Sequence, residues 1–279
     1  GIRPLIRFNS EIVHMEWQGD RWLIRTADGA EDHADVAIMA TGVLHHPKIP
    51  DIPGLASFAG TAMHTARWDP STNLEGKRIG VIGNGSTGVQ MVTHLGKLGH
   101  DIVHFQRSPQ WIMPYPNFKY SEEDKARFRE SRDAIEAIRQ DPIYWANVRR
   151  FTSGIVDIES DRMHEIEEIC LNFLENGVRD PELREKLRPN YRAACKRLIY
   201  SADYYDVAQQ PNVETVVCGI REVTPEGIID NEGVLHRLDV LALATGFHTD
   251  RFIRPISVKG ASGRDIEDAW RERCVAYYA

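Results

Sequence analysis

The chain has 279 residues, of which 42% are apolar, and its formal net charge is −7. This length and apolar content are enough for one large or two modest domains with buried cores. The mild acidity, without any basic block, argues against a nucleic-acid partner. No apolar run reaches the ~20 residues that a membrane helix needs. We therefore expect no membrane span and, without a signal-peptide pattern, a cytoplasmic protein.

The four cysteines are far apart in the sequence and form no C-x-x-C pair; they are Cys170, Cys195, Cys218 and Cys274. This spacing favours reduced thiols over a disulfide framework or a zinc site, and we expect no metal. The chain opens on Gly1 rather than Met and stops at Ala279 without a closing element. These ends favour a piece of a longer protein.

The opening of the chain has a pattern typical of β-strands. Residues 11–17 and 21–26 predict a hairpin turned at Gln18-Gly19-Asp20, because turn residues separate two strand-like runs. Residues 34–39 predict a further short apolar strand that leads into Ala40-Thr41-Gly42. The proline-rich segment from His45 to Leu55 suits neither a helix nor a central strand. We interpret it as a linker.

The tripeptide at 40–42 returns as Ala244-Thr245-Gly246, again after an apolar strand, residues 240–243. Small residues at a strand end permit close approach by a ligand or another backbone. The two copies bracket the central part of the chain, which suggests one domain inserted into another.

A phosphate-binding turn stands at the centre of the sequence. An apolar strand, residues 79–82, precedes a G-x-G-x-x-G motif made of Gly83, Asn84, Gly85, Ser86, Thr87 and Gly88. Helical spacing of apolar residues follows the motif. This context predicts a dinucleotide-binding Rossmann unit, with the pyrophosphate at the helix N-terminus. The alternative is an ordinary glycine-rich turn without a ligand.

The second strand of the unit, residues 102–106, indicates which dinucleotide binds. An NAD site carries Asp or Glu at the end of this strand, for the ribose 2′-hydroxyl. Here Asp101 precedes the strand, whereas Arg107 and Ser108 follow it. A guanidinium suits a 2′-phosphate. We predict NADPH; the alternative is that Arg107 is a solvated charge.

The segment from Ser121 to Pro189 is charged and predicts helices. Ser121 before three acidic residues, and Asp180 before Pro181, are typical helix starts. Its acidic residues are expected to be a solvated helical face. Beyond it, we predict a strand at 213–217 and a hairpin at 228–235.

Several of these segments resemble the type I Baeyer–Villiger monooxygenases of the flavin-containing monooxygenase group. Their signature F-x-G-x-x-x-H-x-x-x-W matches at Phe58, Gly60, His64 and Trp68. The strand end from Phe105 to Trp111 is similar to the NADPH-phosphate segment of 4-hydroxyacetophenone monooxygenase-like members. Lys196-Arg197, followed by Asp203-Tyr204-Tyr205, resembles the lysine–arginine active-site segment.

The resemblance implies a two-dinucleotide-binding-domain α/β flavoprotein: a parallel sheet flanked by helices, with small antiparallel elements and a helical insertion at about 121–190. It implies the cofactors FAD and NADP(H), and insertion of one atom of O2 into a ketone or aldehyde through a C4a-peroxyflavin. The products would be esters or lactones.

The resemblance also assigns roles to residues. Arg197 becomes the catalytic cation that keeps the peroxide anionic, since arginine gives up no proton. Lys196 adds to the phosphate clamp of Arg107. His64 and Trp68 couple the linker to the NADPH domain. The residues placed beside FAD are Thr41, Gly42, Thr245 and Gly246. The alternatives are a surface salt bridge for Arg197 and a structural role for His64.

One departure concerns FAD. The group has an earlier G-x-G-x-x-G for this cofactor, and no other G-x-G occurs in the 279 residues. We therefore expect residues 1–55 to be a remnant of the FAD domain with its linker, 56–240 the NADPH domain, and 241–279 a truncated return to the FAD domain. Alternatives are an N- or S-oxygenating flavin monooxygenase or, for the chain alone, a non-catalytic NADPH-binding module. The sequence indicates neither the substrate nor the oligomeric state.

Overall fold

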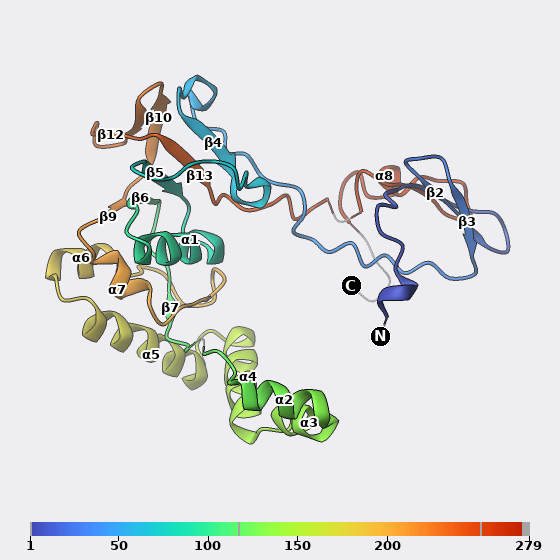
Figure 1. Ribbon diagram of the computed structural model, residues 1–279, viewed down its shortest axis with the longest axis horizontal. Helices are drawn as coiled ribbons and strands as arrows, with labels where there is room; N and C mark the ends of the chain where they lie inside the picture. The colour runs from blue at the N-terminus through green and yellow to red at the C-terminus, as the bar shows by residue number, and fades with distance from the viewer. Residues whose placement is uncertain (1, 117, 252, 275–279) are drawn as a thin grey trace. The chain divides into compact units, whose positions relative to one another are not determined.

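The computed structural model describes residues 2–116, 118–251 and 253–274. The chain divides into two compact units (Figure 1). The large unit is Ile49–Gly246, and the small unit combines Gly1–Lys48 with Phe247–Ala279. The large unit therefore interrupts the small unit in the sequence.

A parallel sheet forms the centre of the large unit. Its strands, in spatial order, are β4 (Thr61–His64), β13 (Val240–Leu243), β5 (Arg78–Ile82), β6 (Asp101–Gln106) and β9 (Val213–Val217). Every neighbouring pair is parallel. Parallel sheets are covered on both faces, which explains why the inner strands read as continuous apolar runs. All four residues of β13 are buried.

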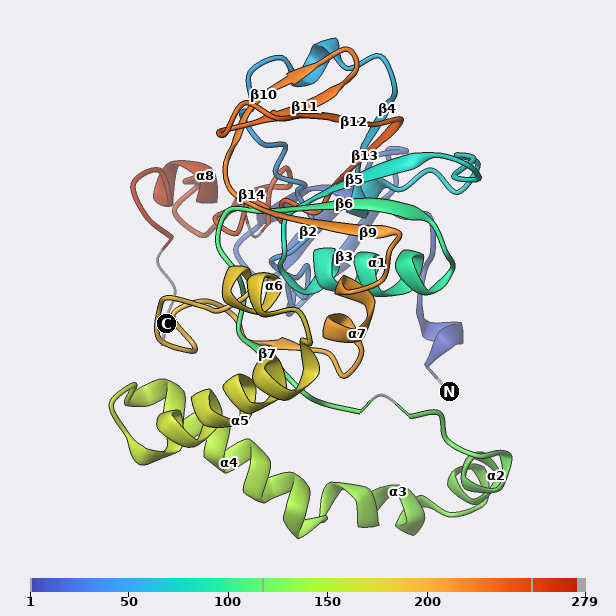
Figure 2. The same ribbon diagram turned by 90° about the vertical axis from the view of Figure 1, so that its left-hand side faces the viewer.

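Different elements cover the two faces of this sheet (Figure 2). Helices α1 (Ser86–Lys97) and α7 (Tyr204–Ala208) lie on one face, in a core cluster that includes Val92 and Val207. An antiparallel sheet covers the other, with Ile228 and Phe105 in its cluster; its strands are β10 (Ile220–Thr224), β11 (Gly227–Asp230) and β12 (Leu235–Arg237). The parallel sheet between two covering layers confirms the α/β Rossmann-type fold.

A helical insertion separates β6 from β9. Its helices are α2 (Glu122–Glu130), α3 (Arg132–Arg139), α4 (Pro142–Val156), α5 (Asp161–Gly177) and α6 (Pro181–Lys186). Ser121 and Asp124 form a capping box at the start of α2, and Asp180 caps α6, so both predicted helix starts are confirmed. Two short parallel strands, β7 (Ile112–Met113) and β8 (Ile199–Tyr200), bring the two ends of the insertion together.

The small unit contains a four-stranded sheet. Its strands, in spatial order, are β14 (Ser257–Lys259), β1 (Ile12–Trp17), β2 (Trp22–Thr26) and β3 (Glu31–Ala34), accompanied by the 3-10 turn η1 (Arg3–Leu5) and the short helix α8 (Ile266–Ala269). The β1–β2 hairpin confirms the strands expected at 11–17 and 21–26. Met15 and Leu23 are buried between the sheet and the segments that cover it.

The strand expected at 34–39 is wrong. β3 ends at Ala34, and the residues after it adopt no strand. The reason is the absence of a pairing partner: β3 pairs with β2, and no described residue forms a strand pair with residues 35–39. Val36 and Ile38 are consequently 74% and 87% exposed. An apolar run alone does not make a strand, because the backbone groups also need partners.

The units also give boundaries that differ from those expected. β13 lies between β4 and β5, so the large unit continues to Gly246 rather than to 240. Of the expected segment 241–279, residues 252 and 275–279 lie outside the described residues. Among the helices that the structure describes, none is long and apolar enough to cross a bilayer.

Candidate functional site

The predicted phosphate turn joins β5 to α1, and its three glycines have distinct roles. Gly83 has a φ of +107°, and a Cβ there would lie 2.5 Å from the Ala244 carbonyl oxygen. A Cβ on Gly88 would lie 1.9 Å from the Gly83 oxygen, whereas a Cβ on Gly85 meets nothing within 4 Å. Thus Gly83 makes the turn, Gly88 permits close helix–strand packing, and Gly85 leaves open space.

The open space lies at the start of α1. Gly85 is the N-cap residue of this helix, and no acidic residue stands in the first turn. The first N–H groups of a helix have no partner within it and carry the positive end of the helix dipole. Ser86 and Thr87 begin the helix beside this opening. The turn therefore has the features of an anion-binding cradle at a helix N-terminus.

A set of buried polar side chains is hydrogen-bonded to the turn. The sequence did not predict this set. Asn84 Nδ2 donates to Gln106 Oε1 at 2.8 Å, and Gln106 Nε2 donates to the Tyr204 hydroxyl at 2.8 Å. His104 Nδ1 lies 3.2 Å from that hydroxyl, and His104 Nε2 lies 3.2 Å from the Gly83 oxygen. Because a carbonyl only accepts, Nε2 carries the proton.

The carboxyl end of β6 carries the residues predicted for the 2′-phosphate. Arg107 follows the strand directly and is exposed, and it makes no hydrogen bond or ion pair with any residue that the structure describes. Lys196 Nζ donates to Ser108 Oγ at 2.6 Å. Asn84 Nδ2 also reaches the Ser108 carbonyl, at 2.7 Å. The structure therefore brings the phosphate turn, Ser108 and Lys196 together, although they are distant in sequence.

At the opposite end of the strand, Asp101 begins β6 and faces Arg78 at 3.6 Å. The acid is thus at the amino end of the strand, as its position in the sequence indicates. A 2′-hydroxyl acceptor is needed at the carboxyl end. Asp101 is therefore not placed to bind the ribose.

The loop that carries Lys196 and Arg197 is held at two places. Tyr191 donates to the Pro109 oxygen at 3.0 Å, and the Lys196 ammonium lies 4.2 Å from the centre of the Tyr191 ring. Glu167 of α5 accepts from the Ala193 N–H at 2.9 Å. Ala194 then takes a φ of +64°, which a residue with a Cβ rarely adopts. Such a conformation persists only where surrounding contacts impose it.

Arg197 follows this constrained turn and is exposed. No described carboxylate pairs with it, so the alternative of a surface salt bridge finds no support among these residues. The positive charge and the hydrogen-bond donors of the Arg197 guanidinium are therefore available to bind another group.

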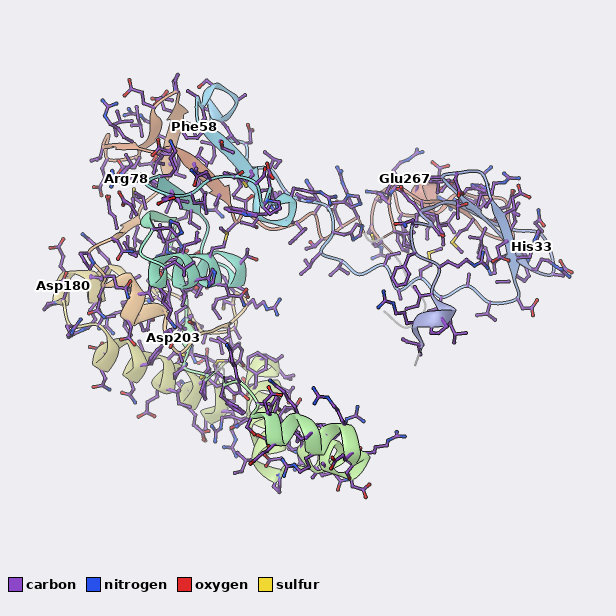
Figure 3. The ribbon with its side chains drawn as sticks, in the orientation of Figure 1. His33, Phe58, Arg78, Asp180, Asp203 and Glu267 are labelled. Atoms are coloured by element: carbon purple, nitrogen blue, oxygen red, sulfur yellow. The ribbon has the colours of Figure 1, made fainter. Side chains whose placement is uncertain are left out.

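The four fixed positions of the F-x-G-x-x-x-H-x-x-x-W segment attach β4 to the rest of the large unit. Phe58, labelled in Figure 3, packs against the cluster of the antiparallel sheet. A Cβ on Gly60 would lie 2.2 Å from the Asp239 oxygen. His64 Nδ1 accepts from the Ala66 N–H and its Nε2 lies 2.9 Å from the Gly246 oxygen. With Nδ1 as acceptor, Nε2 is the donor, which suits a positioning role.

Trp68 completes the segment by packing against the cluster on the opposite face of the sheet, which also contains Met63 of β4.

The two Ala-Thr-Gly copies lie in different units but share a local conformation. Gly42 and Gly246 have φ values of +72° and +80°, and neither has an atom within 4 Å of a built Cβ. Thr41 and Thr245 precede them, each with partners of its own. Each turn is open to close approach.

A cavity of about 390 Å³ lies within the helical insertion. Its walls are mostly apolar and come from α4, α5 and the β7–β8 pair, including Met113, Phe151, Ile166 and Tyr200. All four cysteines are free thiols. Burial raises the pKa of Cys170 to about 12, so this thiol stays protonated.

The profile of the pyridine nucleotide-disulphide oxidoreductase family matches residues 4–167. The chain belongs to this family. The match includes the β5–α1–β6 unit and the Phe58–Trp68 segment, and it agrees with the cradle described above. The family's description mentions disulphide chemistry, but the present chain contains no C-x-x-C pair.

Within this family, the chain is similar to monooxygenases. It is 40% identical to an uncharacterized monooxygenase of Mycobacterium tuberculosis, over 98% of the chain and 54% of that protein. It is 34% identical to a Baeyer-Villiger monooxygenase of Streptomyces coelicolor, over 97% and 52%. The crystal structure of cyclohexanone monooxygenase from Rhodococcus sp. Phi1 bound to NADP⁺ matches with 30% identity and a TM-score of 0.78, over 99% and 59%.

These matches confirm the resemblance to Baeyer–Villiger monooxygenases that the motifs indicate. The chain spans about half the length of the curated relatives it matches.

Proposed function

We propose that the full-length protein is an FAD- and NADPH-dependent monooxygenase that inserts one oxygen atom of O2 into a ketone or aldehyde, giving an ester or lactone. The observation that carries the proposal is the phosphate cradle at Gly83–Gly88, joined through Ser108 to the Lys196–Arg197 loop. The similarity to named Baeyer–Villiger monooxygenases supports the reaction type.

NADPH fits the residues of the large unit. The open space at Gly85 and the N–H groups that begin α1 would hold its pyrophosphate. Arg107, Ser108 and Lys196 supply two cations and a hydroxyl for the 2′-phosphate. Since Lys196 donates to Ser108 Oγ, the Ser108 proton remains available to a phosphate oxygen. A carboxylate, which would repel that phosphate, is absent from the described residues of the β6 end, 106–108.

FAD has less support within this chain. A related protein, OTEMO, has been solved with both FAD and NADP. Here a single G-x-G-x-x-G is present, and the NADPH assignment uses it. The open turns at Gly42 and Gly246 suit close approach by a flavin, but they offer no second pyrophosphate cradle. We propose that the phosphate turn for FAD lies outside these 279 residues.

When bound, FAD supplies the activated oxygen. In the proposed site, Arg197 would stabilise negative charge on that oxygen, because an unpaired guanidinium favours an anion and gives up no proton at working pH. Lys196 holds Ser108 and the nucleotide rather than the reacting oxygen. His64 holds the turn at Gly246 and transfers no proton.

The proposal is tested with the full-length protein, NADPH and a panel of cyclic ketones, aryl ketones, amines and sulfides. Products are analysed by mass spectrometry, and flavin is measured by absorbance. Lactones or esters formed with one NADPH each would support the proposal. Exclusive formation of N- or S-oxides would make the protein a heteroatom oxygenase. NADP⁺ binding without any flavin would indicate a non-catalytic module.

A further inference from the structure

The buried polar side chains beneath the phosphate turn form a directed chain of hydrogen bonds. His104 Nε2–H donates to the Gly83 oxygen, which leaves Nδ1 as an acceptor. The Tyr204 hydroxyl donates to Nδ1 and accepts from Gln106 Nε2. Gln106 Nε2 also lies 3.3 Å from His104 Nδ1, a longer contact than the two through the hydroxyl. Gln106 Oε1 then accepts from Asn84 Nδ2. The chain therefore begins and ends on adjacent residues of the turn, Gly83 and Asn84, and every donor along it has an acceptor.

The three central residues of this network, His104, Gln106 and Tyr204, are buried. His104 is 0% exposed, and Gln106 and Tyr204 are each 2% exposed. A buried polar group that loses its partner is costly, so the members of a buried network hold one another in a single geometry. Asp203, labelled in Figure 3, precedes Tyr204 and pairs with Lys97 of α1 at 2.5 Å.

The geometry determines where the turn's N–H groups point. In a trans peptide the C=O and the next N–H point in opposite directions. The bond from His104 fixes the Gly83 carbonyl toward the network, so the Asn84 N–H points away from it. Through its second hydrogen, Asn84 also holds the Ser108 carbonyl, and Ser108 contacts Lys196. One network thus sets both the turn and the adjoining strand end.

We propose that His104, Gln106 and Tyr204 are positioning residues that pre-organise the Gly83–Asn84 turn and thereby set the affinity for the dinucleotide phosphates. This inference rests on the proposed nucleotide binding. The network touches no reacting atom, so it governs affinity and leaves the chemical step unchanged. Pre-organisation raises affinity because the ordering of the turn is completed before the ligand arrives.

Two neighbouring tyrosines provide a matched test. Tyr204 and Tyr205 are each 2% exposed, but only Tyr204 belongs to the network; Tyr205 has no hydroxyl hydrogen bond within the described residues. In the full-length protein, Tyr204→Phe should weaken NADP⁺ binding by about tenfold, the usual range for one buried hydrogen bond. It should raise KM for NADPH by the same factor and leave kcat at saturating NADPH within about twofold of the wild-type value. Tyr205→Phe should change neither.

Rescue separates positioning from bulk packing. His104→Gln keeps a donor and an acceptor at the ring's position and should stay within about threefold of wild-type affinity, whereas His104→Leu should lose at least about tenfold. Equal affinities for the Tyr204→Phe and Tyr205→Phe proteins would overturn the proposal. So would a loss of folding in both Tyr204→Phe and Gln106→Leu while Tyr205→Phe folds, since that result assigns the network to stability alone.

Amide hydrogen exchange makes the test independent of the nucleotide. In nucleotide-free protein, Tyr204→Phe should speed exchange of the Gly83 and Val89 N–H groups, which donate to the Phe105 and Gly85 carbonyls, by about tenfold relative to Tyr205→Phe. If wild type binds no NADP⁺ but this difference appears, the proposed function fails and the positioning of the turn stands. If wild type binds and no difference appears in either affinity or exchange, the positioning inference alone fails.

Discussion

We propose that the choice between NADPH and NADH depends on Arg107, because this residue is exposed and unpaired among the described residues at the end of β6. Loss of a charged hydrogen bond typically costs about 1.5–3 kcal/mol, or roughly 10- to 150-fold. Arg107→Ala should therefore raise KM for NADPH by that factor and leave NADH little changed. The measurement is steady-state NAD(P)H oxidation by the full-length protein, with the exposed Arg129→Ala as control. Equal losses for both cofactors would show that Arg107 does not bind the 2′-phosphate.

Arg197 has a different expected signature, since its proposed partner is the activated oxygen. One electrostatic group of this kind is worth about 3–4 kcal/mol, or 100- to 1,000-fold. Arg197→Ala should still consume NADPH, release hydrogen peroxide and form almost no ester. Arg197→Lys should recover only part of the ester, because an ammonium lacks the planar fork. Ester and peroxide are quantified together per NADPH consumed. Wild-type coupling in Arg197→Ala would instead move the catalytic cation, with Lys196 the next candidate.

His104 links stability to pH. Burial lowers the pKa of His104 to about 4, although the bond to the Gly83 carbonyl opposes the shift. The unfolded chain, with an ordinary histidine pKa near 6.5, binds the proton more readily, so stability falls as pH drops from about 6.5 toward 4. Between pH 7.5 and 5, this one group should cost about 2 kcal/mol. Urea unfolding at both pH values measures this cost, and the difference in unfolding free energy between the two pH values should be smaller in His104→Gln than in wild type. The same difference in both proteins would mean that His104 binds a proton as readily in the folded as in the unfolded chain.

At the scale of elements, helix α5 holds the loop that presents Lys196 and Arg197. Glu167 accepts from both Arg192 Nε and the Ala193 N–H, and its side chain is 14% exposed. Glu167→Ala should cost the loop about 1.5–3 kcal/mol of local stability. Hydrogen exchange of residues 193–198 should rise more than exchange in β5. Glu168→Ala, exposed on the same helix, is the control. Equal exchange in the two variants would show that α5 does not hold the loop.

The elements that the sequence predicts well are those determined by residues close together in the sequence. The β5–α1–β6 unit follows from three glycines and two apolar strands, and the starts of α2 and α6 follow from Ser121 and Asp180. The segment 34–39 was predicted wrongly because strand formation depends on a neighbouring strand, which the apolar pattern does not report.

The contacts of the site are harder to predict for a related reason. His104 and Tyr204 meet across 100 positions of sequence, and Glu167 reaches Ala193 from a separate helix. A buried histidine between apolar residues of a strand was the available signal for the network. Its hydrogen-bond partner Tyr204 comes within reach only because α7 packs against the sheet.

At the scale of the whole molecule, the large unit contains the entire candidate NADPH site within one continuous stretch, 49–246, whereas the small unit is assembled from two stretches. The predicted FAD neighbours are divided between them, with Thr41 and Gly42 in one unit and Thr245 and Gly246 in the other. We therefore expect the chain, when produced alone, to bind one of the two cofactors without the other.

Residues 1–279, expressed and purified by themselves, should bind NADP⁺ but hold no stoichiometric FAD. The physical reason is that a flavin dinucleotide needs a pyrophosphate cradle of its own, and we assign the chain's single G-x-G-x-x-G to NADPH. Calorimetry measures NADP⁺ binding, and absorbance near the flavin bands measures FAD after desalting. A matched sample with Gly85→Val, which fills the open space above the turn, should lose NADP⁺ and stay colourless. A yellow, flavin-saturated protein from these residues alone would contradict the prediction. It would also assign the Gly83–Gly88 cradle to FAD if Gly85→Val removed the colour.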